Sequence, residues 1–155
     1  MTALSDQDLS WMYSQFLSFA VRKTGNEWQR LVTDLMHVRH GAAFFQVDPA
    51  GRGDKGCDGW VEGLMLACYG GTTPKQSKVT AKVREDYAKA VTFWGSAMNQ
   101  WAFVHNNANG LSEMVMKAFV DLVTANPDSE ITVAPWPPQV LHERRPRDLP
   151  CIPPI

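Results

Sequence analysis

Apolar residues recur at helical spacing in two segments near the start of the chain. We expect a first helix over residues 6–22, with Ser5 as its N-cap and acidic residues in its first turn. A second helix is predicted to begin after Thr24, because Thr24 and Glu27 have the T-x-x-E spacing of a capping box. The buried face of this second helix is predicted to consist of Trp28, Leu31, Val32, Leu35 and Met36.

Short apolar segments with strand-like composition alternate with further helical patterns in the rest of the chain. Strands are expected at residues 42–47, 60–69, 101–105 and 131–133. The 60–69 segment is either one bent strand or a hairpin that turns near Glu62-Gly63, and its second half is apolar enough for a central strand. A third helix is predicted to open at Thr73-Pro74, and a fourth carries an apolar stripe from Leu111 to Leu122.

This alternation of helices and short strands predicts the α/β class, as a three-layer α/β/α domain with a short mixed sheet. Residues 1–133 are interpreted as a single domain, in keeping with a chain of 155 residues. From Ala134 onward proline dominates the sequence, so residues 134–155 are expected to form an extended tail or a linker without regular helix or sheet.

The charge and cysteine content exclude several classes of protein. The net charge is −1, so no general basic field indicates nucleic acid, although a local basic face remains open. The three cysteines form no CxxC pair, which argues against a zinc ribbon or a disulfide framework and favours a reducing compartment. No segment resembles a secretory signal or approaches the ~20 apolar residues of a membrane span. We therefore expect a cytoplasmic protein with no membrane partner.

The most distinctive stretch is the glycine-rich loop at residues 51–60, which contains Asp54, Lys55 and Asp58. Glycine is favoured where the backbone takes a positive φ or approaches another group closely. Two carboxylates four residues apart in such a loop can converge on a cation. They can equally stabilise a tight turn through side-chain to backbone hydrogen bonds, and the residues alone leave both interpretations open.

Other polar residues also have both a structural and a functional interpretation. The capping box with Thr24 is a sufficient explanation of Glu27. His105 ends an apolar strand and is better explained as a hydrogen-bonded histidine at the sheet rim than as a catalyst. Lysines recur at near-helical spacing on the third predicted helix, and they form either a solvated face or a stripe that follows phosphates: Lys75, Lys78, Lys82 and Lys89.

In this order the elements resemble a degenerate PD-(D/E)xK nuclease core. That core has a helix with a glutamate, a strand, an aspartate near the start of a second strand, and E/Q-x-K on a third. Glu27 and Asp58 fall at the first two acidic positions, whereas Ala67 and Tyr69 fall where E/Q and lysine are expected. The resemblance implies a restriction-endonuclease-like fold.

A closer resemblance is to a domain of prokaryotic anti-phage systems of the ABC-three-component type, and it covers about residues 24–133. It is carried by the segments Gly53-Asp54-Lys55-Gly56-Cys57-Asp58-Gly59, Tyr69, Asp86 with Trp94, Trp101-Ala102-Phe103-Val104-His105-Asn106, and Asn126-Pro127 before Ile131.

Together these resemblances imply a nuclease-fold domain of a defence system that engages nucleic acid or a partner protein. Asp54 and Asp58 would hold Mg²⁺, Glu27 would bind metal or orient water, and Lys55 would contact phosphate. Lys75, Lys78 and Lys82 would contact nucleic acid. Because Ala67 and Tyr69 replace the acid and the lysine, a partly or wholly inactive site is favoured.

The alternative is a non-catalytic sensor or adaptor that binds other proteins of a defence operon. The sequence is compatible with a homo-oligomer and with a chain that is part of a longer protein.

Overall fold

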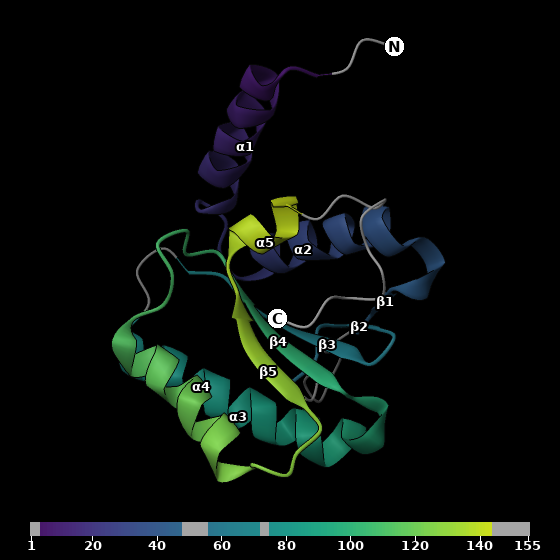
Figure 1. Cartoon of the computed structure of the whole chain (residues 1–155), viewed down its shortest axis with the longest axis vertical. Helices are drawn as coiled ribbons and strands as arrows, with labels where there is room; N and C mark the ends of the chain where they lie inside the picture. The colour runs from purple at the N-terminus through teal and green to yellow at the C-terminus, as the bar shows by residue number, and fades with distance from the viewer. Residues whose placement is uncertain (1–3, 48–55, 72–74, 144–155) are drawn as a thin grey trace.

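The computed structural model of the chain describes residues 4–47, 56–71 and 75–143, and Figure 1 shows their arrangement. The helices are α1 (Asp6–Ala20), α2 (Gly25–His40), α3 (Gln76–Trp94), α4 (Glu113–Ala125) and α5 (Pro138–Glu143). The strands are β1 (Phe45–Gln46), β2 (Gly59–Val61), β3 (Leu64–Tyr69), β4 (Gln100–His105) and β5 (Thr132–Trp136). Short 3₁₀ turns at Gly41–Ala43 and Gly95–Ala97 follow α2 and α3.

The strands form one mixed sheet in the order β1-β2-β3-β4-β5. β2 is antiparallel to both β1 and β3, whereas β3, β4 and β5 are parallel to one another. The predicted mixed α/β class is therefore confirmed. In the β3–β4 pair Tyr69 lies opposite His105, so both strands end at the same edge of the sheet.

The segment 60–69 is a hairpin rather than one bent strand. β2 and β3 are joined by Glu62 and Gly63, which have φ angles of 48° and 87°. Positive φ at both central residues is the hallmark of the type I′ turn, whose twist matches that of antiparallel strands. Of the two interpretations of this segment, the hairpin is confirmed.

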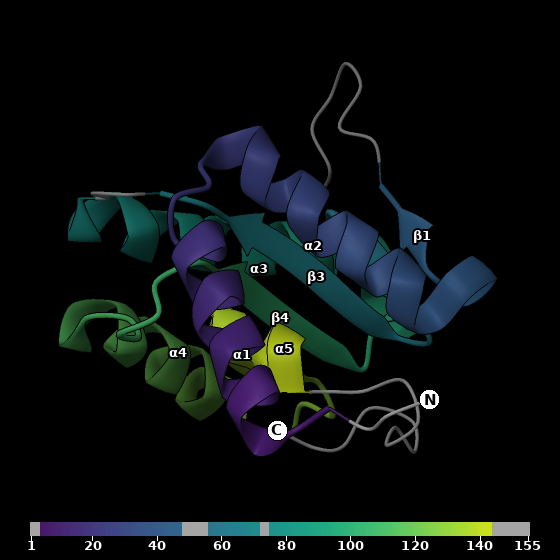
Figure 2. The ribbon, with the colours of Figure 1, turned by 90° about the horizontal axis from the view of Figure 1, so that it is seen from above.

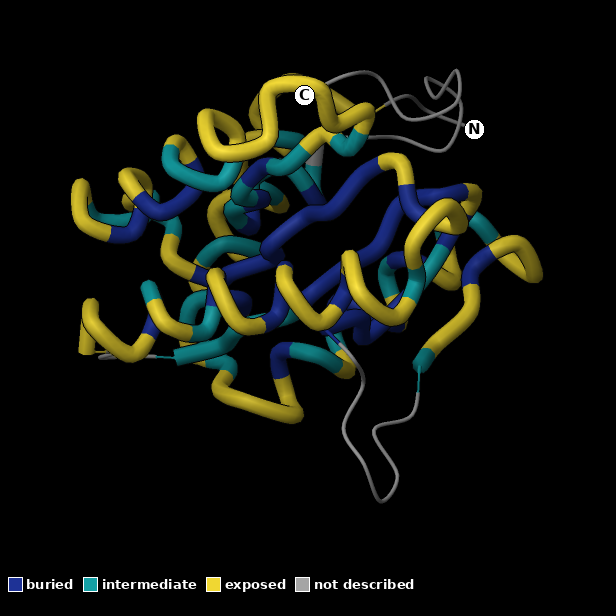
Figure 3. The backbone as a smooth tube through the Cα atoms, turned by 90° about the horizontal axis from the view of Figure 1, so that it is seen from below, coloured by how far each residue is buried: buried dark blue, intermediate teal, exposed yellow. Residues whose placement is uncertain are grey.

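Helices lie on both faces of the sheet, as the ribbon seen from above illustrates (Figure 2). The buried side chains form two separate clusters, one on each face. On one face α2 and α5 pack on alternate strand residues such as Leu66 and Val104. On the other face α3 and α4 pack on the intervening residues, including Met65 and Phe103. The central strands are buried between these layers (Figure 3). This is the predicted three-layer arrangement.

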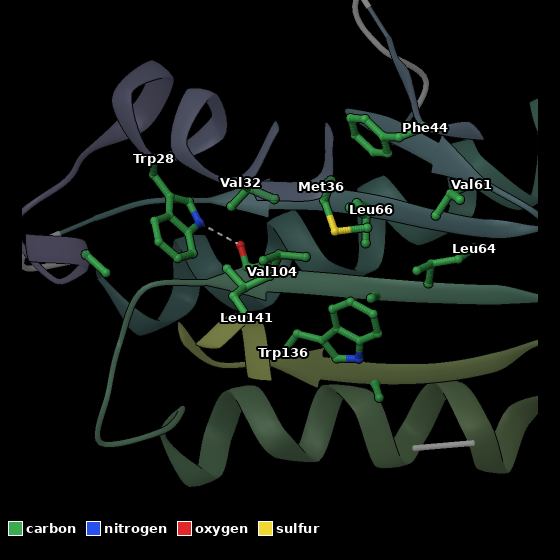
Figure 4. Close-up of a cluster of buried hydrophobic side chains, with 13 residues drawn as sticks. Trp28, Val32, Met36, Phe44, Val61, Leu64, Leu66, Val104, Trp136 and Leu141 are labelled. Atoms are coloured by element: carbon green, nitrogen blue, oxygen red, sulfur yellow. Dashed lines mark hydrogen bonds between the residues drawn. The ribbon is translucent and has the colours of Figure 1, made fainter. Parts of the chain in front are cut away.

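The buried face of α2 agrees with the helical pattern of the sequence. Trp28, Val32 and Met36 are buried, and Leu31 and Leu35 are partly buried against the same cluster. The indole Nε1 of Trp28 donates a hydrogen bond of 2.9 Å to the carbonyl of Val104, which fixes α2 on β4 (Figure 4). Burial of an aromatic side chain together with its polar N–H is a strong determinant of how two elements dock.

The prediction that no regular structure follows Ala134 is wrong for residues 134–143. β5 continues to Trp136, and α5 places Leu141 in the core with 2% of its surface exposed. Pro135 is tolerated because β5 is an edge strand of the described sheet, and Pro138 begins a helix, where its missing N–H costs little. Residues 144–155 lie outside the described part of the chain.

The helix starts agree with the sequence in part. At α1, Ser5 and Asp8 form a reciprocal capping box. Thr24 is the N-cap of α2, but its side chain makes no capping hydrogen bond, so the predicted Thr24–Glu27 capping box is not formed. The predicted start of α3 at Thr73-Pro74 lies outside the described residues, and Lys75 is the N-cap of that helix.

Candidate functional site

The glycine-rich loop rejoins the described fold at Gly56, and Asp54 and Lys55 lie outside the described residues. Gly56 has a φ of 74°, and its carbonyl accepts a 3.1 Å hydrogen bond from the indole of Trp101. A Cβ at this position would overlap the carbonyl oxygen of Asp86 and lie 2.8 Å from the carbonyl carbon of that residue. The end of the loop is therefore packed tightly against α3, the lysine-bearing helix.

Asp58 is buried, with 8% of its surface exposed, and it binds the backbone on two sides. Its N–H donates to the carbonyl of Leu66 at 2.6 Å, and its carbonyl accepts the N–H of Val47 at 3.0 Å. Its carboxylate oxygen Oδ2 accepts the N–H of Cys68 at 2.6 Å. The Asp58 carboxylate thus accepts a backbone N–H of β3 just beyond the residues of β3 that pair with β2. This hydrogen bond gives Asp58 a structural role.

Glu27 is exposed on α2 and lines a shallow surface depression with Lys23, Arg30 and Asp34. Within residues 4–47, 56–71 and 75–143, no three acidic, histidine or cysteine side chains come together as a metal-binding group. The structure therefore does not unite Glu27 and Asp58 with a third ligand among its described residues. The proposed ligand Asp54 lies outside these residues.

The β3 positions that carry E/Q and lysine in the nuclease pattern face the core beneath α3. Ala67 is buried with 1% of its surface exposed. Tyr69 stacks on Phe103, with a distance of 5.7 Å between ring centroids and an interplanar angle of 22°. Neither residue supplies a carboxylate or an ammonium group there, so β3 contributes packing where the nuclease pattern has metal chemistry.

The lysines of α3 fall into two groups. Lys82 pairs with the buried Asp86 at 2.9 Å, so its charge is already compensated within the helix. Lys75 and Lys78 are exposed near the start of α3, and neither joins an ion pair among the described residues. Lys89 is also exposed farther along α3 and joins none of these ion pairs. Lys75 and Lys78 at the start of α3, together with Lys89, are therefore the members of the predicted basic stripe that remain available to a ligand.

A polar cluster lies at the ends of β3 and β4, and its central member is Asn106. Asn106 is buried, and its Oδ1 accepts the N–H of Gly71 at 3.2 Å. Its Nδ2 donates to the carbonyl of Ala20 at 3.1 Å and also to that of Lys23. This one amide therefore joins the end of α1 to the segment after β3, a role that the sequence alone did not indicate.

His105 precedes Asn106 and is almost fully buried, with 3% of its surface exposed. Its Nδ1 accepts the N–H of Asn107 at 3.2 Å, which confirms the expected hydrogen-bonded histidine at the sheet rim. Burial disfavours the charged imidazolium and lowers the pKa of His105 to about 4. The ring is therefore neutral at physiological pH, with its proton on Nε2.

Comparison of the chain with models of protein families, with curated proteins and with solved structures gave no match. The geometry of the chain itself must therefore support any functional proposal. Among the described helices, none combines the length and apolar character that a membrane crossing requires.

Proposed function

We propose that the chain is a nuclease-fold domain of a prokaryotic anti-phage defence system that binds nucleic acid at a site no longer equipped for cleavage. Support for the nuclease-like fold comes from the order of α2, β1, β2 and β3, with Asp58 directly before β2. This order reproduces the helix, strand, aspartate and third strand of the PD-(D/E)xK pattern, and α3 and β4 continue it.

The single observation that carries the proposal is the local chemistry of Asp58 and β3. A metal-dependent nuclease needs several oxygen ligands on Mg²⁺ and a cation near the scissile phosphate. Here Asp58 binds the amide of Cys68, and buried Ala67 and the stacked Tyr69 occupy the positions of the acid and the lysine. These residues favour retention of the fold with loss of the chemistry. Asp54 and Asp58 are proposed to bind Mg²⁺ only if the chain still cleaves nucleic acid.

Binding of nucleic acid is proposed through Lys75 and Lys78, which are exposed at the start of α3. Phosphate contacts by lysines make affinity fall with salt, because each contact releases condensed counterions. For the double variant Lys75→Gln/Lys78→Gln, we expect affinity for single-stranded DNA and RNA to fall about tenfold at low salt, and the salt dependence to weaken by about two phosphate contacts. Fluorescence anisotropy of labelled strands with a 5′-hydroxyl end measures both quantities.

The matched control removes the same amount of charge from the α1–α2 side of the molecule. Lys23 and Arg30 line the depression on that side, and the variant Lys23→Gln/Arg30→Gln should bind as the unmodified protein does. Equal weakening by the two double variants would show that only the overall charge matters, and it would contradict a binding face on α3.

A second candidate function, the non-catalytic adaptor, is favoured by exposed apolar residues on α4 and α1. Met116, Val120 and Val123 are 38%, 55% and 55% exposed and follow one another at helical spacing on α4. On α1, Trp11 and Phe19 are 64% and 51% exposed. Such faces are typical of contacts with another protein. Sedimentation velocity tests this alternative. The adaptor is favoured if the chain associates in a concentration-dependent manner, if Val120→Lys abolishes this association, and if the chain binds no nucleic acid.

A further inference from the structure

A small cavity is lined by residues from the ends of β3 and β4 and from the starts of α3 and α4. Its volume is about 20 Å³, and its walls include Tyr69, His105, Gln76 and Ser112. This volume accommodates one group of the size of a water molecule. The carboxyl ends of parallel strands are a common place for ligands in α/β proteins, because loops and helix starts converge there.

Two of the side chains that line this cavity, His105 and Gln76, carry N–H groups that can donate hydrogen bonds to a ligand. Because Nδ1 of His105 accepts the N–H of Asn107, Nε2 carries the ring proton. Among the described residues Nε2 has no hydrogen-bond partner, although the residue is buried and lines the cavity. The hydroxyl of Ser112 donates to Oε1 of Gln76, which leaves the amide N–H groups of Gln76 without a partner in the described part of the chain.

The starts of two long helices also face this point. Gln76 is the first residue of α3 and Ser112 is the N-cap of α4, and the hydrogen bond between their side chains joins the two helix starts. The N-terminus of a helix carries a partial positive charge, so both helices favour an anion at the cavity. Lys75 and Lys78 add full positive charges beside the start of α3.

We propose that this cavity is a binding site for a phosphate oxyanion, with His105 and Gln76 donating hydrogen bonds to its oxygens. No hydrogen bond within the described residues uses the Nε2 N–H of His105, and a phosphate oxygen is a suitable acceptor for it. The volume admits an oxygen of the phosphate and leaves the remainder of the ligand outside the cavity. The bound phosphate group belongs either to a free nucleotide or to the 5′-phosphate end of a nucleic acid strand. The site is argued from its own geometry and does not depend on the proposed function.

Inorganic phosphate is the first probe, with the side-chain ¹⁵N resonances of His105 as the readout in the full chain. We expect a saturable shift of the Nε2 resonance with phosphate and none with equal concentrations of chloride. Gln76→Met should raise the dissociation constant about tenfold, because one hydrogen bond to a charged oxygen is lost. Gln7→Met on the exposed start of α1 is the matched control and should leave the constant unchanged.

Two further ligands distinguish the sources. Tighter binding of a 5′-phosphorylated strand than of adenosine monophosphate identifies a nucleic acid end, and equal binding identifies a free nucleotide. Absence of a saturable shift with phosphate, or equal effects of Gln76→Met and Gln7→Met, would overturn the site. Strands with a 5′-hydroxyl end have no terminal phosphate, so their binding tests Lys75 and Lys78 separately from the cavity. If the protein does not bind these strands, the proposed function is contradicted, whereas the response to inorganic phosphate stays intact.

Discussion

Gly56→Ala is expected to lower the free energy of unfolding by about 4 kcal/mol, a large loss for a single substitution. The new Cβ would overlap the carbonyl oxygen of Asp86, which belongs to the backbone of α3 and cannot move aside as a flexible side chain can. Alanine would also have to adopt a φ of 74°. Strain at positive φ costs about 1–3 kcal/mol, and overpacking adds a similar amount. Urea unfolding followed by tryptophan fluorescence measures the loss.

Gly110→Ala separates the two contributions. Gly110 also has a positive φ, of 86°, but a Cβ there would meet no atom within 4 Å. Its substitution should therefore cost only the conformational term, about 1 kcal/mol. If the two variants lost the same free energy of unfolding, the steric overlap with α3 would contribute nothing. That result would contradict tight packing of the glycine-rich loop against this helix.

Stability is expected to fall by about 3 kcal/mol between pH 7 and pH 4 because of His105 alone. Its pKa is about 4 in the folded protein, against 6.5 for an unperturbed histidine. The unfolded chain therefore binds more protons in this range, so protons favour unfolding. The contribution is complete above about pH 6.5 and is lost as the pH falls towards 4. Urea unfolding at a series of pH values measures this slope.

His105→Gln isolates this contribution, because glutamine offers an acceptor to the Asn107 N–H but does not titrate. Burial also lowers the pKa of His40, with a smaller contribution of the same sign in the same range. The difference between the unmodified protein and the variant removes the His40 contribution, which is common to both. Parallel pH profiles for the two proteins would show that His105 is not buried as a neutral ring in solution.

The helices and the central strands could be predicted from the sequence because their burial follows a regular period. The spacing of Trp28, Val32 and Met36 gives one face of a helix, and the apolar run of β3 fits a strand covered on both sides. The structure after Ala134 could not be predicted from composition alone. Proline is excluded from central strands and helix interiors, but Pro135 lies on an edge strand and Pro138 begins a helix.

The candidate site was predictable only in part, because its contacts depend on the pairing of strands. Sequence spacing identified Asp58 but not its bond to the Cys68 amide, which arises from the register of the β2–β3 hairpin. Similarly, the strand that ends at His105 was predicted, but the cavity lined by Gln76 and Ser112 depends on the parallel pairing of β3 and β4. The mismatch at Ala67 and Tyr69 was visible in the sequence, and the structure shows that Ala67 is part of the core and that the partly buried Tyr69 packs against it.

Nucleic acid cleavage in the presence of Mg²⁺ or Mn²⁺ tests the central claim most directly, with the unmodified protein and Asp58→Asn compared on single- and double-stranded DNA and RNA. Asparagine retains an acceptor for the Cys68 amide while removing the charge that a metal would need. We predict that lysine-dependent binding occurs and that both proteins leave every strand intact. Metal-dependent cleavage by the unmodified protein that Asp58→Asn abolishes, at equal thermal stability, would contradict this prediction.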